Sequence, residues 1–273
     1  PSPPPTGGAP HWIAAVRARH PDAAELTLPL DPELQEAATR ALRDVLRELS
    51  ARGADAGAVV VLHNPTGEVR AWVGSPDWRD PRHGQFDAAR ALRQPGSTLK
   101  PFTYALAFEE GLRPADLLPD LPLEYGGAGD DWRPRNYSGR YHGPVRARLA
   151  LANSWNAPAV AVAARLGTGP LLARLREAGF RSLDGPAERY GLGLTLGDGE
   201  VTLLEQVTAY ACLARGGLYR ERIDLLAARD AGGARLGPAA AAAGAGPRRV
   251  FDPRAAFLVQ SILISIAPRN MPT

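Results

Sequence analysis

The chain has 273 residues, of which 45% are hydrophobic, so it is long enough to bury a sizeable core in one large domain. A net charge of +3 with scattered basic residues excludes a strongly basic nucleic-acid binder, and no apolar run reaches the roughly 18 residues of a membrane-spanning helix. The single cysteine, Cys212, cannot form an internal disulfide and is expected to be a small buried hydrophobe.

The first part of the chain is predicted to hold a linker, one long helix and a hairpin. Residues 1–24 are rich in proline, glycine and alanine and are predicted to be a linker. Apolar residues recur at helical spacing from Asp31 to Ser50, with Asp31 as the expected N-cap. Two β-rich runs, 58–62 and 69–73, flank a turn that contains proline and glycine, and they predict a β-hairpin.

The rest of the chain is predicted to be mainly helical. A helix is expected to begin at Ser97 and end near Gly111, and turn formers predict irregular structure over residues 114–141. Three more helices are expected over 145–154, 158–166 and 171–178. A glycine-punctuated loop over 191–199 and a helix from Val201 are expected to follow them. Residues 231–247 are low-complexity Ala/Gly and are predicted to be a flexible excursion.

The basic residues carry the first chemical signal. Lysine and arginine total 32, yet Lys100 is the one lysine among them. A surface charge tolerates arginine, but a group that must lose its proton does not, because a guanidinium stays charged at any working pH. Lys100 is therefore a candidate for proton chemistry.

Lys100 lies three residues after Ser97, in Gln94-Pro-Gly-Ser-Thr-Leu-Lys100. A serine at a helix start and a lysine at i+3 lie on one face of the first turn, where the helix dipole favours the oxyanion side of acyl transfer. A desolvated lysine can take the proton of the serine and make it a nucleophile. The plain alternative is a serine N-cap with a solvated lysine one turn later.

A second short motif, Ser154-Trp155-Asn156, follows further along the chain. Ser154 could relay a proton between Lys100 and a leaving amine, and the Asn156 amide could hold a substrate carbonyl. Taken alone, Ser-x-Asn is a weak signal, because a helix-to-loop junction favours both residues. The pattern gains weight because it follows Ser-x-x-Lys along the chain, in the order that serine acyl-transfer enzymes show.

Together these stretches resemble the transpeptidase domain of class A penicillin-binding proteins, and the wording of the second motif is closest to their 1C branch. The first motif is matched by residues 93–102 and the second by 154–160, and the runs 132–145 and 200–217 are also similar. The resemblance implies a transpeptidase domain over residues 25–273. It also implies an α/β (α+β) fold of the β-lactamase-like type, an antiparallel sheet packed on helices with an all-helical subdomain that carries both motifs.

The resemblance implies a peptidoglycan D,D-transpeptidase, in which a D-Ala-D-Ala stem peptide acylates Ser97 and the acyl group passes to an amine, cross-linking the cell wall. β-Lactams would acylate the same serine. Lys100 would be the base, Ser154 the proton relay, and Asn156 and Trp155 substrate contacts, with no cofactor and no metal. The parent protein would carry a membrane anchor and a glycosyltransferase domain upstream. It would act at the periplasmic face of the bacterial inner membrane, where other cell-wall synthesis proteins are expected partners.

One departure from the family pattern concerns the third motif, Lys-Thr/Ser-Gly. The single lysine belongs to the first motif, so the third is absent from this sequence. In the family, the strand that carries it binds the substrate carboxylate and contributes an oxyanion-hole amide. We therefore expect the C-terminal strands to be missing, with an open sheet edge, exposed apolar helix faces, low stability and weak or no catalysis.

Two alternatives stay open at this stage. A carboxypeptidase or β-lactamase would use water in place of the acceptor amine, and Glu188 and Glu200 are the acids in the region where a deacylating residue would be sought. A decayed, non-catalytic peptidoglycan-binding module would account for the missing third motif, although the retained lysine argues against it. Outside the motifs, His142 is expected to be structural, and Asn136 and Tyr137 are weaker candidates for lining the cleft.

Overall fold

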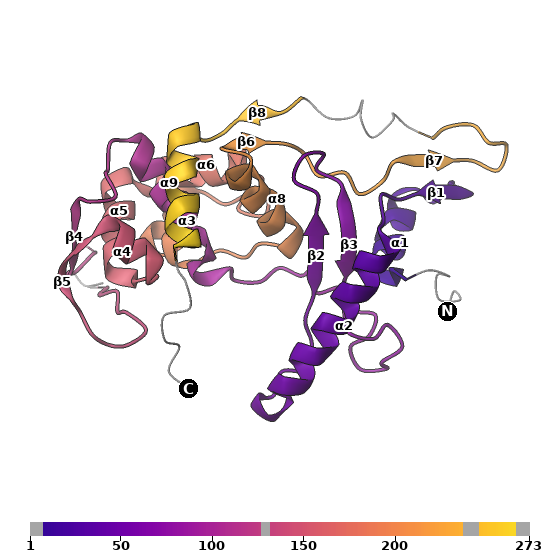
Figure 1. The fold of residues 1–273 in the computed structure, drawn as a ribbon, viewed down its shortest axis with the longest axis horizontal. Helices are drawn as coiled ribbons and strands as arrows, with labels where there is room; N and C mark the ends of the chain where they lie inside the picture. The colour runs from indigo at the N-terminus through magenta and orange to yellow at the C-terminus, as the bar shows by residue number, and fades with distance from the viewer. Residues whose placement is uncertain (1–7, 127–131, 237–245, 266–273) are drawn as a thin grey trace. The chain divides into compact units, whose positions relative to one another are not determined.

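The computed structural model describes residues 8–126, 132–236 and 246–265, so most of the predicted Ala/Gly excursion lies outside the described residues. The chain forms two compact units (Figure 1). The first comprises Pro1–Leu92, Thr202–Ala211 and Arg220–Arg248, and the second comprises Arg93–Val201, Cys212–Tyr219 and Arg249–Thr273. Within the described ranges, no helix is both long and apolar enough to cross a membrane.

The first unit is built on the predicted hairpin. Strand β2 (Val59–Leu62) pairs antiparallel with β3 (Val69–Val73), and Ala38 and Leu42 of helix α2 (Pro32–Leu49) pack on the hairpin. The Asp31 carboxylate accepts a hydrogen bond from the Leu34 amide at 3.0 Å, which confirms the predicted helix and its cap. The short elements that complete this unit are η1 (Ser50–Arg52) and the antiparallel pair β1 (Glu25–Thr27) and β7 (Ala227–Arg229).

Helix α1 (Pro10–Arg19) lies inside the stretch that was predicted to be a linker. Trp12 is fully buried, stacks on Trp72 with ring centroids 6.1 Å apart, and donates its indole N–H to the Asp224 carbonyl at 2.9 Å. The linker prediction is therefore wrong for these ten residues, because two buried aromatic rings outweigh the linker-like composition around them. The domain boundary after residue 24 stays a prediction.

The second unit is helical and centres on α3 (Lys100–Glu109), in which every residue except Glu109 is buried. Helix α3 contacts α5 (Asn156–Leu166), α6 (Thr168–Glu177) and α9 (Pro253–Ile264), and Phe102 meets Phe180 edge to face at 5.2 Å. The further elements are η2 (Gly96–Leu99), α4 (Ala147–Ala152), α7 (Ala187–Tyr190), η3 (Gly191–Leu196) and β6 (Leu218–Tyr219), while α8 (Leu203–Ala214) and β8 (Arg248–Arg249) straddle the two units. Cys212 is buried, as predicted.

Strand β4 (Leu117–Asp120) pairs antiparallel with β5 (Gly143–Arg146) in the second unit. The prediction of irregular structure over residues 114–141 is therefore wrong at β4, and the helix predicted from Val145 begins at Ala147. The sequence hides this strand because Pro119 interrupts it. Proline is tolerated there because each strand of a two-stranded sheet has an unpaired edge.

Apolar side chains are exposed on two helices of the second unit, as expected from the sequence. Phe257 and Ile264 of α9 are 66% and 80% exposed, and Leu149 of α4 is 45% exposed. Among the described residues, each sheet has only two strands, so the hairpin β2–β3 is not joined by a third. Unpaired edges and exposed apolar faces of this kind are sites where another segment or another chain can pack.

Trp12→Ala tests whether α1 belongs to the folded core. We expect it to lower the free energy of unfolding by about 3–5 kcal/mol, because it removes a fully buried indole and leaves a cavity. Urea unfolding followed by far-ultraviolet circular dichroism measures the change. Arg17→Ala, on the exposed side of the same helix, should stay within about 0.5 kcal/mol of the parent chain. Equal stability of the two variants would show that α1 is only loosely attached.

Candidate active site

The first motif lies where a tight turn runs into α3. Ser97 is on the 3-10 turn η2 and is exposed, whereas Leu99 is fully buried and anchors the turn. Lys100 is the first residue of α3, and only 1% of its surface is exposed. The predicted arrangement of a serine and a lysine at a helix start is therefore confirmed as local structure, with the serine facing solvent and the lysine buried.

The buried lysine is surrounded by oxygen atoms of the second motif. Its Nζ donates to the Ser154 carbonyl at 2.5 Å and to Asn156 Oδ1 at 2.6 Å, and Ser154 Oγ lies 3.2 Å away. Burial lowers the pKa of Lys100 to about 8, because an ammonium removed from water is disfavoured. At pH 7 about a tenth of the molecules then carry the neutral amine, which can accept a proton.

Ser154 holds an unusual backbone conformation. Its φ is +54°, and it is the one non-glycine residue with positive φ in the part of the chain that the structure describes. A left-handed conformation costs roughly 1 kcal/mol or more for a residue with a Cβ, and such residues gather at functional sites. This turn brings the Ser154 carbonyl and hydroxyl to the same lysine.

Asn156 begins α5 and has both ends of its amide engaged. Its oxygen accepts from Lys100, and its Nδ2 donates to the Arg135 carbonyl at 2.7 Å. The neighbouring Trp155 stacks on His142, with ring centroids 4.3 Å apart and ring planes 19° apart. Trp155 thus points to a protein ring, and one N–H of Asn156 is left for a further acceptor.

The predicted site residues are therefore brought together only in part. Lys100, Ser154 and Asn156 meet, while none of the hydrogen bonds between described residues joins the Ser97 hydroxyl to Lys100 or Ser154. Since hydrogen bonds of a catalytic site often tighten only with substrate, a serine one turn from the lysine remains a candidate nucleophile. Of the other residues considered from the sequence, Glu188, Glu200 and Tyr137 are exposed. Asn136 is buried, and its side chain contacts the second motif at the Asn156 backbone N–H.

A glycine-punctuated segment that the sequence predicted only as a loop supports the first motif. A Cβ on Gly197 would lie 2.2 Å from the Gly96 nitrogen, so the two backbones touch next to Ser97. Thr195 and Thr103 share a buried hydrogen bond of 2.8 Å. Arg93 and Val201 exchange two backbone hydrogen bonds of 3.0 and 2.9 Å. In the sequence this support was indicated by the glycine at position 197. The structure shows why a glycine is needed there, since its φ is +98° and a side chain has no room.

A helical unit that carries an exposed serine, a buried lysine one turn later and a second serine against that lysine defines the serine acyltransferase class of enzyme. Consistent with this, the sequence profile of the family described as penicillin binding protein transpeptidase domain matches residues 57–270. The chain belongs to this family, as the resemblance of its motifs predicted.

Curated relatives carry penicillin-binding names. Penicillin-binding protein 1A of Neisseria meningitidis is 37% identical over 213 residues, which cover 76% of this chain and 26% of that protein. Penicillin-binding protein 1C of Escherichia coli is 40% identical over 162 residues, which cover 59% of this chain and 20% of that protein. The chain thus spans about a quarter or less of the length of these relatives.

Solved structures share the fold. Penicillin-binding protein 1A of Haemophilus influenzae matches with a TM-score of 0.67 and 27% identity, over 81% of this chain and 36% of that one. PonA1 of Mycobacterium tuberculosis, solved with penicillin V, matches with a TM-score of 0.71 and 23% identity, over 90% of this chain and 65% of that one. The predicted fold, helices with antiparallel sheets in the manner of these transpeptidase domains, is confirmed.

Gly197→Ala tests the support of the first motif. A methyl group there must displace the Gly96 backbone, so we expect a loss of about 1–3 kcal/mol in stability and a clear fall in acylation by a fluorescent penicillin. Gly169→Ala is the matched control, because a Cβ at Gly169 in α6 meets nothing within 4 Å. A folded Gly197→Ala protein that acylates at the parent rate would contradict the supporting role.

Proposed function

We propose that this chain is the part of a peptidoglycan D,D-transpeptidase that forms the acyl-enzyme, with Ser97 as nucleophile and Lys100 as base. The observation that carries the proposal is the buried Lys100, which lies one turn from an exposed serine and has its Nζ 3.2 Å from a second serine hydroxyl. A lysine needs burial to serve as a base near neutral pH, and its pKa of about 8 suits that task.

The acylation step uses groups of this chain. The Lys100 amine takes the Ser97 proton as Ser97 Oγ bonds to the penultimate D-Ala carbonyl carbon. The carbon–nitrogen bond to the terminal D-Ala then breaks, and its amine receives a proton from Lys100 through the Ser154 hydroxyl. An incoming amine on a neighbouring strand then attacks the ester carbon and gives a proton to Lys100. The bond from that carbon to Ser97 Oγ breaks, Oγ takes the proton back from Lys100, and the new amide leaves. Asn156 and Trp155 are the proposed substrate contacts.

The β-lactam ring presents the same kind of carbonyl, so penicillins are the natural probe of this site. Two related structures at lower identity support the choice of probe, since penicillin-binding protein A of Mycobacterium tuberculosis was solved as imipenem and ceftriaxone acyl-enzyme complexes. For the whole protein we propose the setting of its class A relatives, with a glycosyltransferase domain and a membrane anchor, at the periplasmic face of the inner membrane. Because the third motif is absent from this sequence, we expect acylation to be slow.

Labelling by a fluorescent penicillin tests the proposal most directly. The parent chain should give a fluorescent band on a denaturing gel, and Ser97→Ala should give none. Lys100→Arg keeps the positive charge but cannot release its proton, so the labelling rate should fall about 100-fold or more. Circular dichroism confirms that each variant is folded. A labelled Ser97→Ala protein would place the nucleophile elsewhere, and a fully active Lys100→Arg protein would exclude Lys100 as the base.

The pH dependence of acylation tests the protonation state of the lysine. Only the neutral amine accepts a proton, so the rate should rise about tenfold per pH unit below the pKa of about 8 and level off above it. Rates of labelling measured between about pH 6 and pH 9.5 give the profile, with free penicillin loss measured in parallel. A flat profile over this range would show that another group controls the step.

A further inference from the structure

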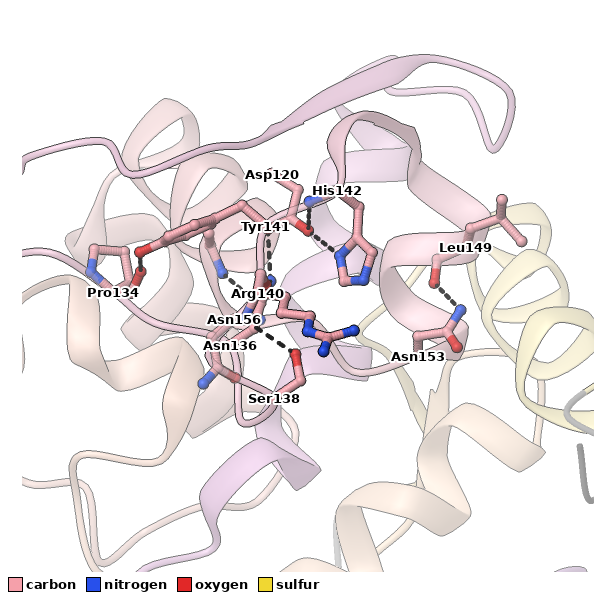
Figure 2. Close-up of polar contacts among 11 residues, drawn as sticks. Asp120, Pro134, Asn136, Ser138, Arg140, Tyr141, His142, Leu149, Asn153 and Asn156 are labelled. Carbon is pink, nitrogen blue, oxygen red and sulfur yellow. Dashed lines mark hydrogen bonds and ion pairs between the residues drawn. The ribbon is translucent and has the colours of Figure 1, made fainter. Parts of the chain in front are cut away.

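A fully buried carboxylate lies close to the second motif. Asp120, at the end of β4, has no exposed side-chain surface. It accepts three hydrogen bonds: from Asn136 Nδ2 at 2.7 Å, from the His142 amide at 3.0 Å and from His142 Nδ1 at 2.6 Å (Figure 2). A buried carboxylate is costly unless it is fully hydrogen-bonded, so these partners are held firmly. Burial and, to a smaller extent, the negative charge of Asp120 raise the pKa of the Tyr104 phenol.

One partner of Asp120 fixes the start of α5. Asn136 Oδ1 accepts from the backbone N–H groups of Asn156 at 2.7 Å and Ala157 at 3.3 Å. The residue at the N-cap position, Trp155, supplies no side-chain cap, so Asn136 replaces it from a distant part of the sequence. The Asp120–Asn136 pair thereby fixes the point at which α5 begins, at Asn156.

The other partner of Asp120, His142, contacts Trp155, the residue between Ser154 and Asn156. The His142 ring is held by Asp120 on one side and stacks on Trp155 on the other. The His142 side chain remains 39% exposed, so its burial contributes little to the core. Its pairing with Asp120 follows from the β4–β5 register, because Asp120 lies opposite Gly143, the next residue along.

We propose that His142 is a positioning residue: held by Asp120 and stacked on Trp155, it keeps Ser154 and Asn156 in register against Lys100. This inference rests on the proposed acyl transfer at Ser97. The left-handed turn at Ser154 is unfavourable on its own, Lys100 binds its carbonyl, and His142 stacks on the ring of the next residue, Trp155. If the ring is released, the oxygens around Lys100 move and water reaches the amine.

Three substitutions separate the two contacts of His142. His142→Asn places an amide N–H near the position of Nδ1, so it keeps a hydrogen bond to Asp120 but has no ring for Trp155. His142→Phe keeps a ring and loses the hydrogen bond, and His142→Ala loses both. Tyr141→Phe is the matched control, because it also removes one hydrogen bond from the same segment, the one from Tyr141 Oη to the Pro134 carbonyl at 3.0 Å.

The single lysine gives a readout that does not depend on activity. Lysine labelled with carbon-13 at Cε yields one NMR signal from the chain, that of Lys100. We expect the midpoint of its titration to rise by about 0.5–1 pH unit in His142→Ala and His142→Asn, as water reaches the amine, and to stay unchanged in Tyr141→Phe. The rate of acylation by fluorescent penicillin should fall about 10- to 100-fold in the same two variants, and by less in His142→Phe.

The outcomes distinguish the inference from the function on which it rests. An unchanged Lys100 signal in folded His142→Ala overturns the positioning role, whatever the acylation rate. A shifted signal with a parental acylation rate overturns it as well, because the displacement would then be without consequence. A parent chain that is not acylated, with a Lys100 signal that shifts as expected in the variants, refutes acyl transfer by this chain and supports the positioning of Lys100 by His142.

Discussion

The removal of one lysine side chain from water is the constraint on which the rest of this site depends. Lys100 is buried at the first turn of α3, and its Nζ finds its oxygen partners in Ser154 and Asn156. Desolvation favours the neutral amine, while the surrounding oxygens keep the group oriented toward the second motif. The two motifs therefore need each other. The first without the second would leave a buried amine unpaired, and the second without the first would leave the oxygens of a strained turn without the amine that they bind.

A buried carboxylate, that of Asp120, supports the second motif from the side away from Lys100. Asp120 gathers Asn136 and His142, and these two residues reach the start of α5 and the Trp155 ring. The motif is thus held between a lysine and a carboxylate network, with β4 and β5 supplying the rigid backbone. Short strands and buried polar groups in this region act as the support of a site rather than as a separate core.

Much of the site was predictable from the sequence, because its chemistry depends on residue type. Lys100 stood out as the one lysine in an arginine-rich chain, and the order of the two motifs pointed to the family whose sequence profile matches residues 57–270. The long helix and the hairpin followed from hydrophobic period and turn residues. The contact between Asp120 and His142 could not be predicted, because it arises from a strand pairing that Pro119 conceals. Helix α1 was missed since its stability comes from the Trp12–Trp72 contact, which composition does not reveal.

The joining of distant segments around Ser97 has a consequence for how the protein is made. The turn that carries the serine is closed by Arg93–Val201 pairing, by Gly197 against Gly96 and by the Thr103–Thr195 bond, all between residues about a hundred positions apart. At 5–20 residues per second, the ribosome supplies the second partner of each pair roughly 5–20 s after the first. The serine and lysine therefore leave the ribosome before their surroundings exist. The turn around Ser97 is completed only after residue 201 has been synthesised and the helices between the two segments are in place.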